Sequence, residues 1–171
     1  MLAVRAGDLG AFEHLVKRNQ QAAWSTAYRF LGDAAAAEDI CQEAFLRVLE
    51  AASRYRPEAA FRTYLQRIVG RLCLDHARKK KPIFTAFLPD VADRSPSPQD
   101  LLTDSEDRHD IQTALDQLPP TQRLAVIWKY YEGLSYAEIA QALNTTTKAV
   151  EGLLARGREA LARLLGHLLE Q

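Results

Sequence analysis

Hydrophobic side chains recur every three or four residues along most of the chain, which is the period of an amphipathic α-helix. Residues 9–31 carry one such apolar face, and Asp8 stands where a helix N-cap is expected. Gly32 can adopt the left-handed conformation that ends a helix. Asp33 then precedes a second amphipathic segment, 34–52. Because no stretch alternates with a period of two, the pattern predicts an all-α fold.

The same period continues in a third segment, 58–80, which a proline at position 82 ends. Residues 82–107 interrupt the periodicity with prolines, serines and acidic side chains, and this composition indicates a linker. Shorter helical segments follow at 108–117, 120–131, 136–143 and 147–169. The expected architecture is therefore two small helical domains, 1–81 and 108–171, joined by the acidic linker.

The stretch SYAEIAQALNTTTKAVEGLL has the spacing of a helix-turn-helix. Ser135 and Glu138 match the capping box that starts a helix. Asn144 stands at the turn, where a left-handed residue is needed and asparagine is tolerated. Thr145 or Thr146 would cap the second helix, which in this motif enters the DNA major groove. A plain helical hairpin has the same spacing and remains an alternative.

The net charge is zero, but its distribution along the chain is uneven. Residues 54–81 contain nine basic and two acidic side chains, whereas residues 82–116 contain two basic and eight acidic ones. The basic block also carries aromatic side chains, which favours nucleic acid as a partner over two merely solvated faces. Residues 117–171 have a net charge of only +1, so the helix-turn-helix should bind DNA weakly by itself.

Several functional classes receive no support from the sequence. No apolar run reaches the length of a membrane span, and the N-terminus lacks a secretory signal, so we expect a cytoplasmic protein without membrane insertion. Cys41 and Cys73 lie in helical patterns without metal-ligand spacing, and we expect them in the core. The four histidines are scattered, and no catalytic motif is present. The sequence predicts no enzyme, metal or cofactor.

At three places in order, the chain resembles the extracytoplasmic-function (ECF) sigma factors of bacterial RNA polymerase. AEDICQEAFLRVLE is similar to their region 2.2, and FRTYLQRIVGRLCLDHARKKK is similar to regions 2.3 and 2.4. LDQLPPTQRLAVIWKYYEGLSYAEIAQAL is similar to region 4. The resemblance covers about residues 8–165, and it implies a non-enzymatic protein that binds core RNA polymerase and directs it to promoter DNA. It also implies an anti-sigma factor as a partner.

The resemblance implies a role for three sets of residues. Core polymerase would be bound by Glu38, Asp39, Gln42, Glu43, Phe45 and Leu46. The −10 element would be bound and melted by Arg54, Tyr55, Arg56, Phe61, Arg62, Tyr64, Arg67, Arg71 and Arg78. The −35 element would be read by Thr146, Thr147, Lys148, Glu151, Ala155, Arg156 and Arg158. Stacking of an aromatic ring on an unpaired base would contribute about 1–3 kcal/mol to melting, although Phe61 could equally be a core residue.

The chain departs from the family pattern at three places. Gly70 lies in mid-helix, where it costs about 1 kcal/mol relative to alanine. Arg71 stands where asparagine is frequent, and Glu151 to Leu153 replace a Lys-Ser-Arg run that would make the recognition helix more basic. Two other functions stay open at this point: a stand-alone helix-turn-helix regulator, and a polymerase-binding protein that reads no promoter.

Overall fold

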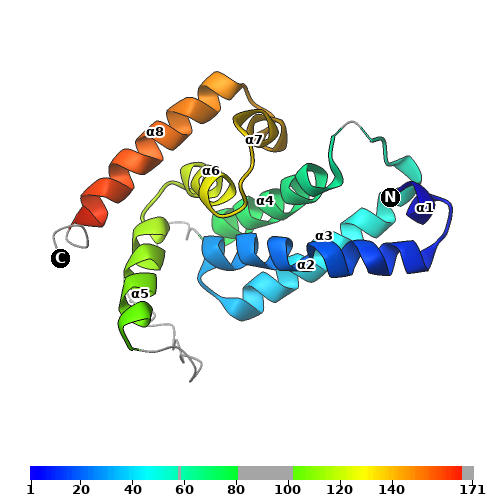
Figure 1. The fold of residues 1–171 in the computed structure, drawn as a ribbon, viewed down its shortest axis with the longest axis horizontal. Coiled ribbons are helices and arrows are strands. Elements are labelled where there is room, and N and C mark those ends of the chain that lie inside the picture. The colour runs from blue at the N-terminus through cyan, green and yellow to red at the C-terminus, as the bar shows by residue number, and fades with distance from the viewer. Residues whose placement is uncertain (58, 81–101, 167–171) are drawn as a thin grey trace.

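The computed structural model describes residues 1–57, 59–80 and 102–166, and this part of the chain is built from helices without a strand (Figure 1). The helices are α1 (Leu2–Arg5), α2 (Leu9–Leu31), α3 (Ala34–Glu50), the 3-10 turn η1 (Ala52–Arg54), α4 (Phe61–Lys80), α5 (Leu102–Asp116), α6 (Pro120–Tyr130), α7 (Tyr136–Leu143) and α8 (Thr147–Leu164). The predicted all-α fold is confirmed. We call residues 1–80 the N-terminal half and residues 102–166 the C-terminal half.

The expected signals set the ends of α2 and α3. The Asp8 carboxylate accepts a hydrogen bond from the backbone N–H of Ala11 at 2.9 Å, and Asp33 accepts one from Ala36 at 3.1 Å. Gly32 has a φ of 67°, so it closes α2 in the left-handed conformation and reverses the chain. These caps satisfy N–H and C=O groups that have no partner within the helix.

The N-terminal half is a bundle of α2, α3 and α4. Small residues on the inner faces let the three helices approach closely. A few larger apolar side chains fill the remaining space between the helices. The buried positions include Ala23, Ala27, Phe30, Ala37, Ala44, Val48, Leu65, Val69 and Cys73. The expectation that Cys41 and Cys73 are buried free thiols is confirmed.

The C-terminal half contains the helix-turn-helix in α7 and α8. Ser135 and Glu138 form the expected reciprocal capping box at the start of α7. Asn144 takes the left-handed conformation with a φ of 54°, and Thr146 caps α8 by accepting from Ala149 N at 3.1 Å. Of the two threonines predicted as candidates for this cap, Thr146 is therefore the N-cap of α8. The interior of the motif is formed by Ile139, Ala140, Val150 and Leu154.

Several element boundaries differ from the sequence expectation. α5 begins at Leu102, inside the predicted linker. The remainder of that linker, 82–101, lies outside the described residues. α4 begins at Phe61 rather than at 58, and α8 ends at Leu164 rather than at 169. The short helix α1 carries too few residues to show a period.

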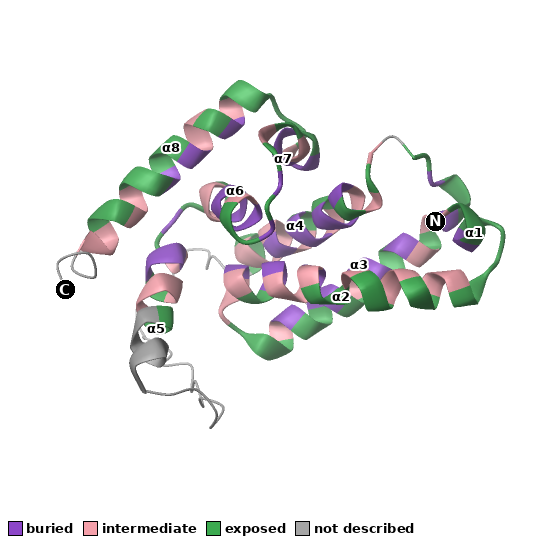
Figure 2. Ribbon diagram, in the orientation of Figure 1, coloured by how far each residue is buried: buried purple, intermediate pink, exposed green. Residues whose placement is uncertain are grey.

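The two halves pack directly against each other in one body. α4 lies between the α2–α3 pair and the α6–α7 pair, so it is covered on two sides (Figure 1). The buried residues of α4, α6 and α7 face one another across this contact (Figure 2), and a single hydrophobic cluster continues from one half into the other. Two linked domains were expected, and their close contact was not.

Candidate polymerase and nucleic-acid interfaces

The exposed face of α3 presents most of the residues expected to bind polymerase. Glu38, Asp39 and Gln42 are exposed, and Leu46 keeps 56% of its surface accessible. Glu43 is half-buried and pairs with Arg47 at 2.7 Å. The remaining member of the predicted set, Phe45, is only 7% exposed and lies in the core instead. The structure therefore groups five of the six residues on one surface.

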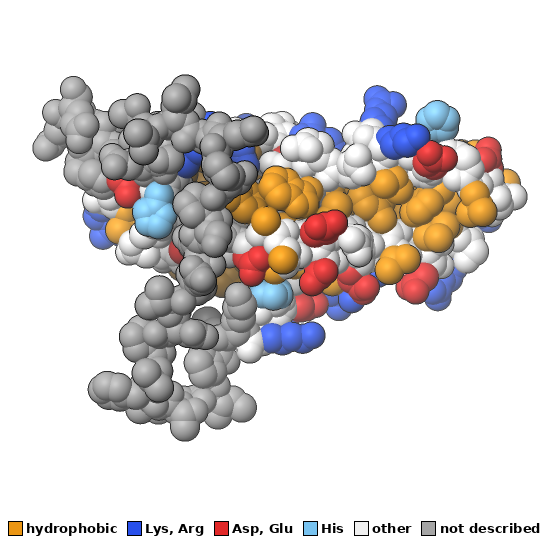
Figure 3. Space-filling view, turned by 90° about the horizontal axis from the view of Figure 1, so that it is seen from below, with side chains coloured by type: hydrophobic (Ala, Val, Ile, Leu, Met, Phe, Trp, Pro, Cys, Tyr) orange, Lys and Arg blue, Asp and Glu red, His pale blue; other side chains and the backbone are white. Residues whose placement is uncertain are grey.

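A band of hydrophobic side chains runs along α2 and α3 on the face shown in Figure 3, and charged side chains border it. Leu9, Tyr28 and Leu46 are among the large exposed apolar residues of the described chain. Trp24 stacks on Tyr28 with ring centroids 4.9 Å apart. An apolar band rimmed by charge is typical of a surface that binds another protein.

The segment that precedes α4 holds the aromatic residues expected to melt DNA. Tyr55 is buried, and its ring meets the edge of Tyr64 with centroids 5.2 Å apart. Phe61 and Tyr64 are half-buried with centroids 6.3 Å apart. Burial raises the pKa of Tyr64, and the neighbouring Tyr55 adds to this shift. Both interpretations of Phe61 thus retain support, because the residue packs against the core but is only partly buried.

Basic side chains surround these aromatic rings. Arg54, Arg56 and Arg67 are exposed and line a cavity of about 260 Å³ together with Tyr55 and Tyr64. Gln141 and Ala142 of α7 complete the wall of this cavity. The C-terminal half therefore closes a space that the expected −10 residues form.

The other expected −10 residues follow along α4. Arg71 and Arg78 are exposed, and Arg78 lies 3.4 Å from the carboxylate of Asp75. Arg62 instead reaches the C-terminal half, where its guanidinium donates to the backbone oxygen and to the carboxylate of Glu132. Of the nine expected residues, Arg62 is thus engaged by the opposite half, and Tyr55 is held in the core.

The residues expected to read the −35 element are all exposed along α8 and at its N-cap, Thr146. Thr147, Lys148, Glu151 and Ala155 follow helical spacing, and Thr146, Arg156 and Arg158 are also exposed. The face contains one acidic and three basic side chains, so its field is only moderately positive. In the role expected from the sequence, Arg156 and Arg158 would contact phosphates, and Lys148 and Glu151 would contact bases.

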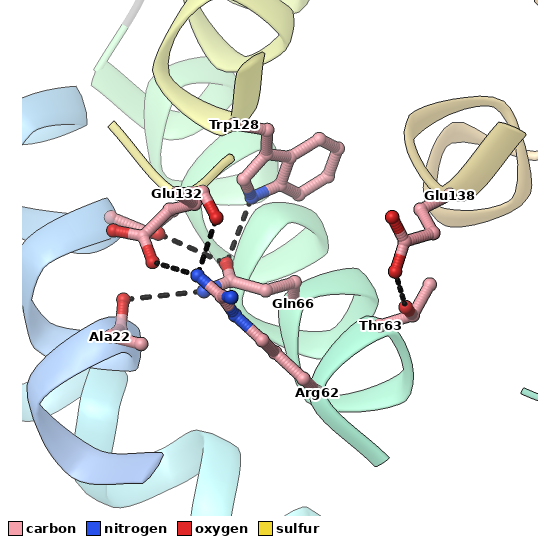
Figure 4. A network of polar contacts seen from close by, with 8 residues as sticks. Ala22, Arg62, Thr63, Gln66, Trp128, Glu132 and Glu138 are labelled. Atoms are coloured by element: carbon pink, nitrogen blue, oxygen red, sulfur yellow. Dashed lines mark hydrogen bonds and ion pairs between the residues drawn. The ribbon is translucent and has the colours of Figure 1, made fainter. Parts of the chain in front are cut away.

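A polar network between the halves was missed by sequence reasoning (Figure 4). Gln66 is fully buried and joins α4 to both neighbouring elements. Its side-chain oxygen accepts from the Trp128 indole N–H at 2.8 Å and from the Thr26 hydroxyl at 3.0 Å. Thr63 on α4 donates to the Glu138 carboxylate at 3.2 Å. The mid-helix Gly70 was the one sequence signal that could have indicated this contact.

Metal and membrane sites receive no support in the part of the chain that the structure describes. No group of three or more potential metal ligands occurs among those residues. None of the helices found there is long and apolar enough to cross a membrane.

Two family models match the chain in the expected order. Residues 15–83 match Sigma-70 region 2, and residues 108–161 match Sigma-70 region 4. The second match begins at residue 108, directly after the predicted end of the linker.

Curated relatives agree with these matches. SigW of Bacillus subtilis, an ECF RNA polymerase sigma factor, is 34% identical over 96% of this chain and 94% of its own length. SigM of Mycobacterium tuberculosis, another ECF RNA polymerase sigma factor, is 36% identical over 95% of this chain and 81% of its own. SigE of Mycolicibacterium smegmatis is 37% identical over 91% of this chain, which spans 63% of that longer protein.

Solved structures show the same fold. CnrH in complex with the cytosolic domain of CnrY aligns over 96% of this chain and 94% of that one, with a TM-score of 0.76 and 24% identity. The sigma factor RpoE of Bartonella quintana, solved with the anti-sigma factor NepR, aligns over 91% of this chain and 97% of its own, with a TM-score of 0.72 and 20% identity.

Proposed function

Since the chain belongs to the ECF group of RNA polymerase sigma factors, we propose that three of its surfaces carry out promoter-specific initiation. The exposed face of α3 binds core polymerase. Phe61, Tyr64 and the arginines of the segment before α4 and of α4 itself bind and melt the −10 element. The start of α8 reads the −35 element, and the protein acts in the cytoplasm without catalysing a reaction.

One observation carries this assignment: five of the six polymerase residues and all of the −35 residues are accessible, and Arg54, Arg56 and Arg67 gather around one cavity, although all were chosen from sequence motifs. Three acidic or amide side chains of α3 lie beside the exposed Leu46, which suits a basic and partly apolar partner. The arginine-rimmed cavity brings positive charge and tyrosine rings together, as binding of single-stranded DNA requires.

Run-off transcription with core polymerase on host DNA tests the function itself. We expect discrete new transcripts that depend on this protein. A stand-alone regulator would bind DNA without polymerase and produce none, and a pure polymerase-binding protein would bind the enzyme and produce none.

The polymerase surface is tested by replacing Glu43 with Ala and Leu46 with Arg in one protein. We expect weaker binding to core polymerase. The change removes the carboxylate of Glu43, and it places a positive charge where the apolar side chain of Leu46 would be covered by the polymerase. Replacing Glu13 with Ala and Leu2 with Arg alters the same residue types outside α3 and serves as the control. An unchanged affinity of the α3 double variant would remove this surface from the proposal.

We also propose that an anti-sigma factor regulates the protein. The support is that CnrH and RpoE, which share the fold, were solved with CnrY and with the anti-sigma factor NepR, and that this chain exposes an apolar band on α2 and α3 (Figure 3). Affinity purification from host cells should recover a small partner. Its absence under all growth conditions would contradict this part of the proposal.

A further inference from the structure

The rotation of α8 about its own axis is fixed by its packing on α6 and α7. Val150, Leu154 and Gly157 are buried at intervals of four and three residues, so they form the inner face of the helix. A Cβ atom at Gly157 would lie 2.8 Å from Cγ2 of Val126 in α6, which shows how closely the two helices approach. Because this face is held inside (Figure 2), the opposite face of α8 is the surface that is open to a partner.

One acidic side chain lies on the open face of α8 near its start. Lys148, Glu151 and Ala155 are exposed and follow one another at intervals of three and four residues, so they form a stripe along the helix. Neither the Lys148 ammonium nor the Glu151 carboxylate has an ion-pair or hydrogen-bond partner among residues 1–57, 59–80 and 102–166. The carboxylate is therefore free to accept hydrogen bonds from a bound molecule.

Positive charge is placed on both sides of this carboxylate. Lys148 precedes Glu151 by about one turn. On the other side, a Cβ atom at Gly152 would lie 3.2 Å from Nη1 of Arg156, so this guanidinium folds back along the helix and lies against the bare backbone of the residue that follows Glu151. These two cations attract phosphates that an isolated acid would repel. An acidic residue at this position is therefore compatible with close approach to DNA.

The four bases offer very different partners to a carboxylate in the major groove. Guanine presents the acceptors N7 and O6, and thymine presents the acceptor O4 beside a methyl group, so neither base can donate to it. Adenine donates from N6, but its N7 acceptor would face the second carboxylate oxygen. Cytosine presents the N4 amino group as a donor and has no acceptor beside it on the same base. A carboxylate therefore favours cytosine.

We infer that Glu151 selects a cytosine in the −35 element by accepting a hydrogen bond from the N4 amino group. The N-terminal residues of a recognition helix contact base edges in helix-turn-helix proteins, and Glu151 lies about one turn after the start of α8 at Thr147. The small residues Gly152 and Ala155 beside it leave room for the base pairs. This inference rests on the proposed function and deepens it by naming the base that one residue reads.

Selection of promoters with a randomised −35 element tests the inference with the holoenzyme. The −10 element is kept as run-off transcription defines it, and the bound promoters are sequenced. We expect the wild type to enrich cytosine at one position by about tenfold over guanine and thymine. Glu151→Gln should change the preference at that position alone to adenine, because the amide oxygen accepts from N6 while the amide nitrogen donates to N7.

Glu159→Gln is the matched control, since it removes the same charge from an exposed position about two turns further along α8. It should leave the selected sequence unchanged. If Glu151→Gln instead strengthens binding to every promoter equally and selects the wild-type sequence, the carboxylate only repels phosphates and the inference is overturned. A wild-type preference for any base other than cytosine at the position that Glu151→Gln changes would also overturn it. If the wild type produces no transcripts in the run-off assay, the proposed function fails instead.

Discussion

Cys73 shows how its surroundings control the chemistry of a single side chain. It is completely buried in the bundle, and desolvation raises the pKa of its thiol from 9.0 to about 12. In the folded state the thiol therefore stays protonated where an unfolded cysteine would ionise. Its contribution to stability is present below pH 9 and is lost as the pH rises toward 12.

We expect Cys73 to react with iodoacetamide at pH 8 only when the protein unfolds. Cys41 is less deeply buried, and burial followed by the nearby Glu38 raises its pKa to a smaller extent, so it should react faster. Peptide mass spectrometry of timed samples measures both rates. Equal rates in native protein would show that the core around Cys73 opens locally.

The capping box at Ser135 is a second residue-scale test. The Glu138 carboxylate accepts from Ser135 N at 2.8 Å and from its hydroxyl at 2.7 Å. These bonds, the backbone one first, lower the pKa of Glu138. A lowered folded pKa stabilises the protein above the unfolded value of 4.5, and this contribution is lost as the pH falls through the lowered value.

We expect Ser135→Ala to reduce the free energy of unfolding by about 1 kcal/mol at pH 7. The difference from wild type should shrink as the pH falls below 4.5 and through the lowered pKa of Glu138. Urea titrations at several pH values measure it. Glu159→Ala, on the exposed side of α8, should change stability by less than about 0.5 kcal/mol; a comparable loss in this control would refute the capping argument.

At the scale of elements, α8 exposes the basic and acidic side chains that we propose to contact the −35 element. Arg156 is exposed and should contact a phosphate rather than a base. Arg156→Ala in the holoenzyme should therefore weaken promoter binding similarly for all sequences and reduce the salt slope of the affinity by about 1. Filter binding at several salt concentrations measures the slope, with Lys17→Ala on α2 as the control. A slope that stays at the wild-type value would place Arg156 away from DNA.

Local signals predicted most elements well because they act within a few residues. Asp8, Gly32, Asp33, Ser135 and Asn144 fix helix ends through their own hydrogen bonds or dihedral angles, and α7 has the bounds expected of it. The early start of α5 was missed because acids and prolines dominate the composition before it. The candidate DNA and polymerase residues came from family motifs, and their exposure could only be seen in the fold.

At the scale of the whole molecule, the contact between the halves could not be predicted because its signals are long-range. Thr63 and Gln66 look like ordinary polar positions of an amphipathic helix, and their partners lie 62 or more residues away in Trp128 and Glu138. Gly70 appears only as an unfavourable helix residue until Trp128 is placed against it.

The continuous core predicts cooperative unfolding of both halves. We expect wild type to show one calorimetric transition, because separating the halves exposes the apolar ring of Trp128 and breaks the hydrogen bond from its indole N–H to Gln66. Gly70→Ala should uncouple the halves and produce two transitions. Two transitions already present in wild type would show that the contact contributes little to stability.

The glycine at the centre of this contact also bears on how often the halves separate. Separation breaks the Trp128–Gln66 hydrogen bond and the packing of α6 on Gly70, so its frequency sets how fast deuterium reaches the buried amides between α4 and α6. In Gly70→Ala those amides should exchange faster, because the added methyl group weakens the contact, while amides between α2 and α3 should keep their wild-type rates.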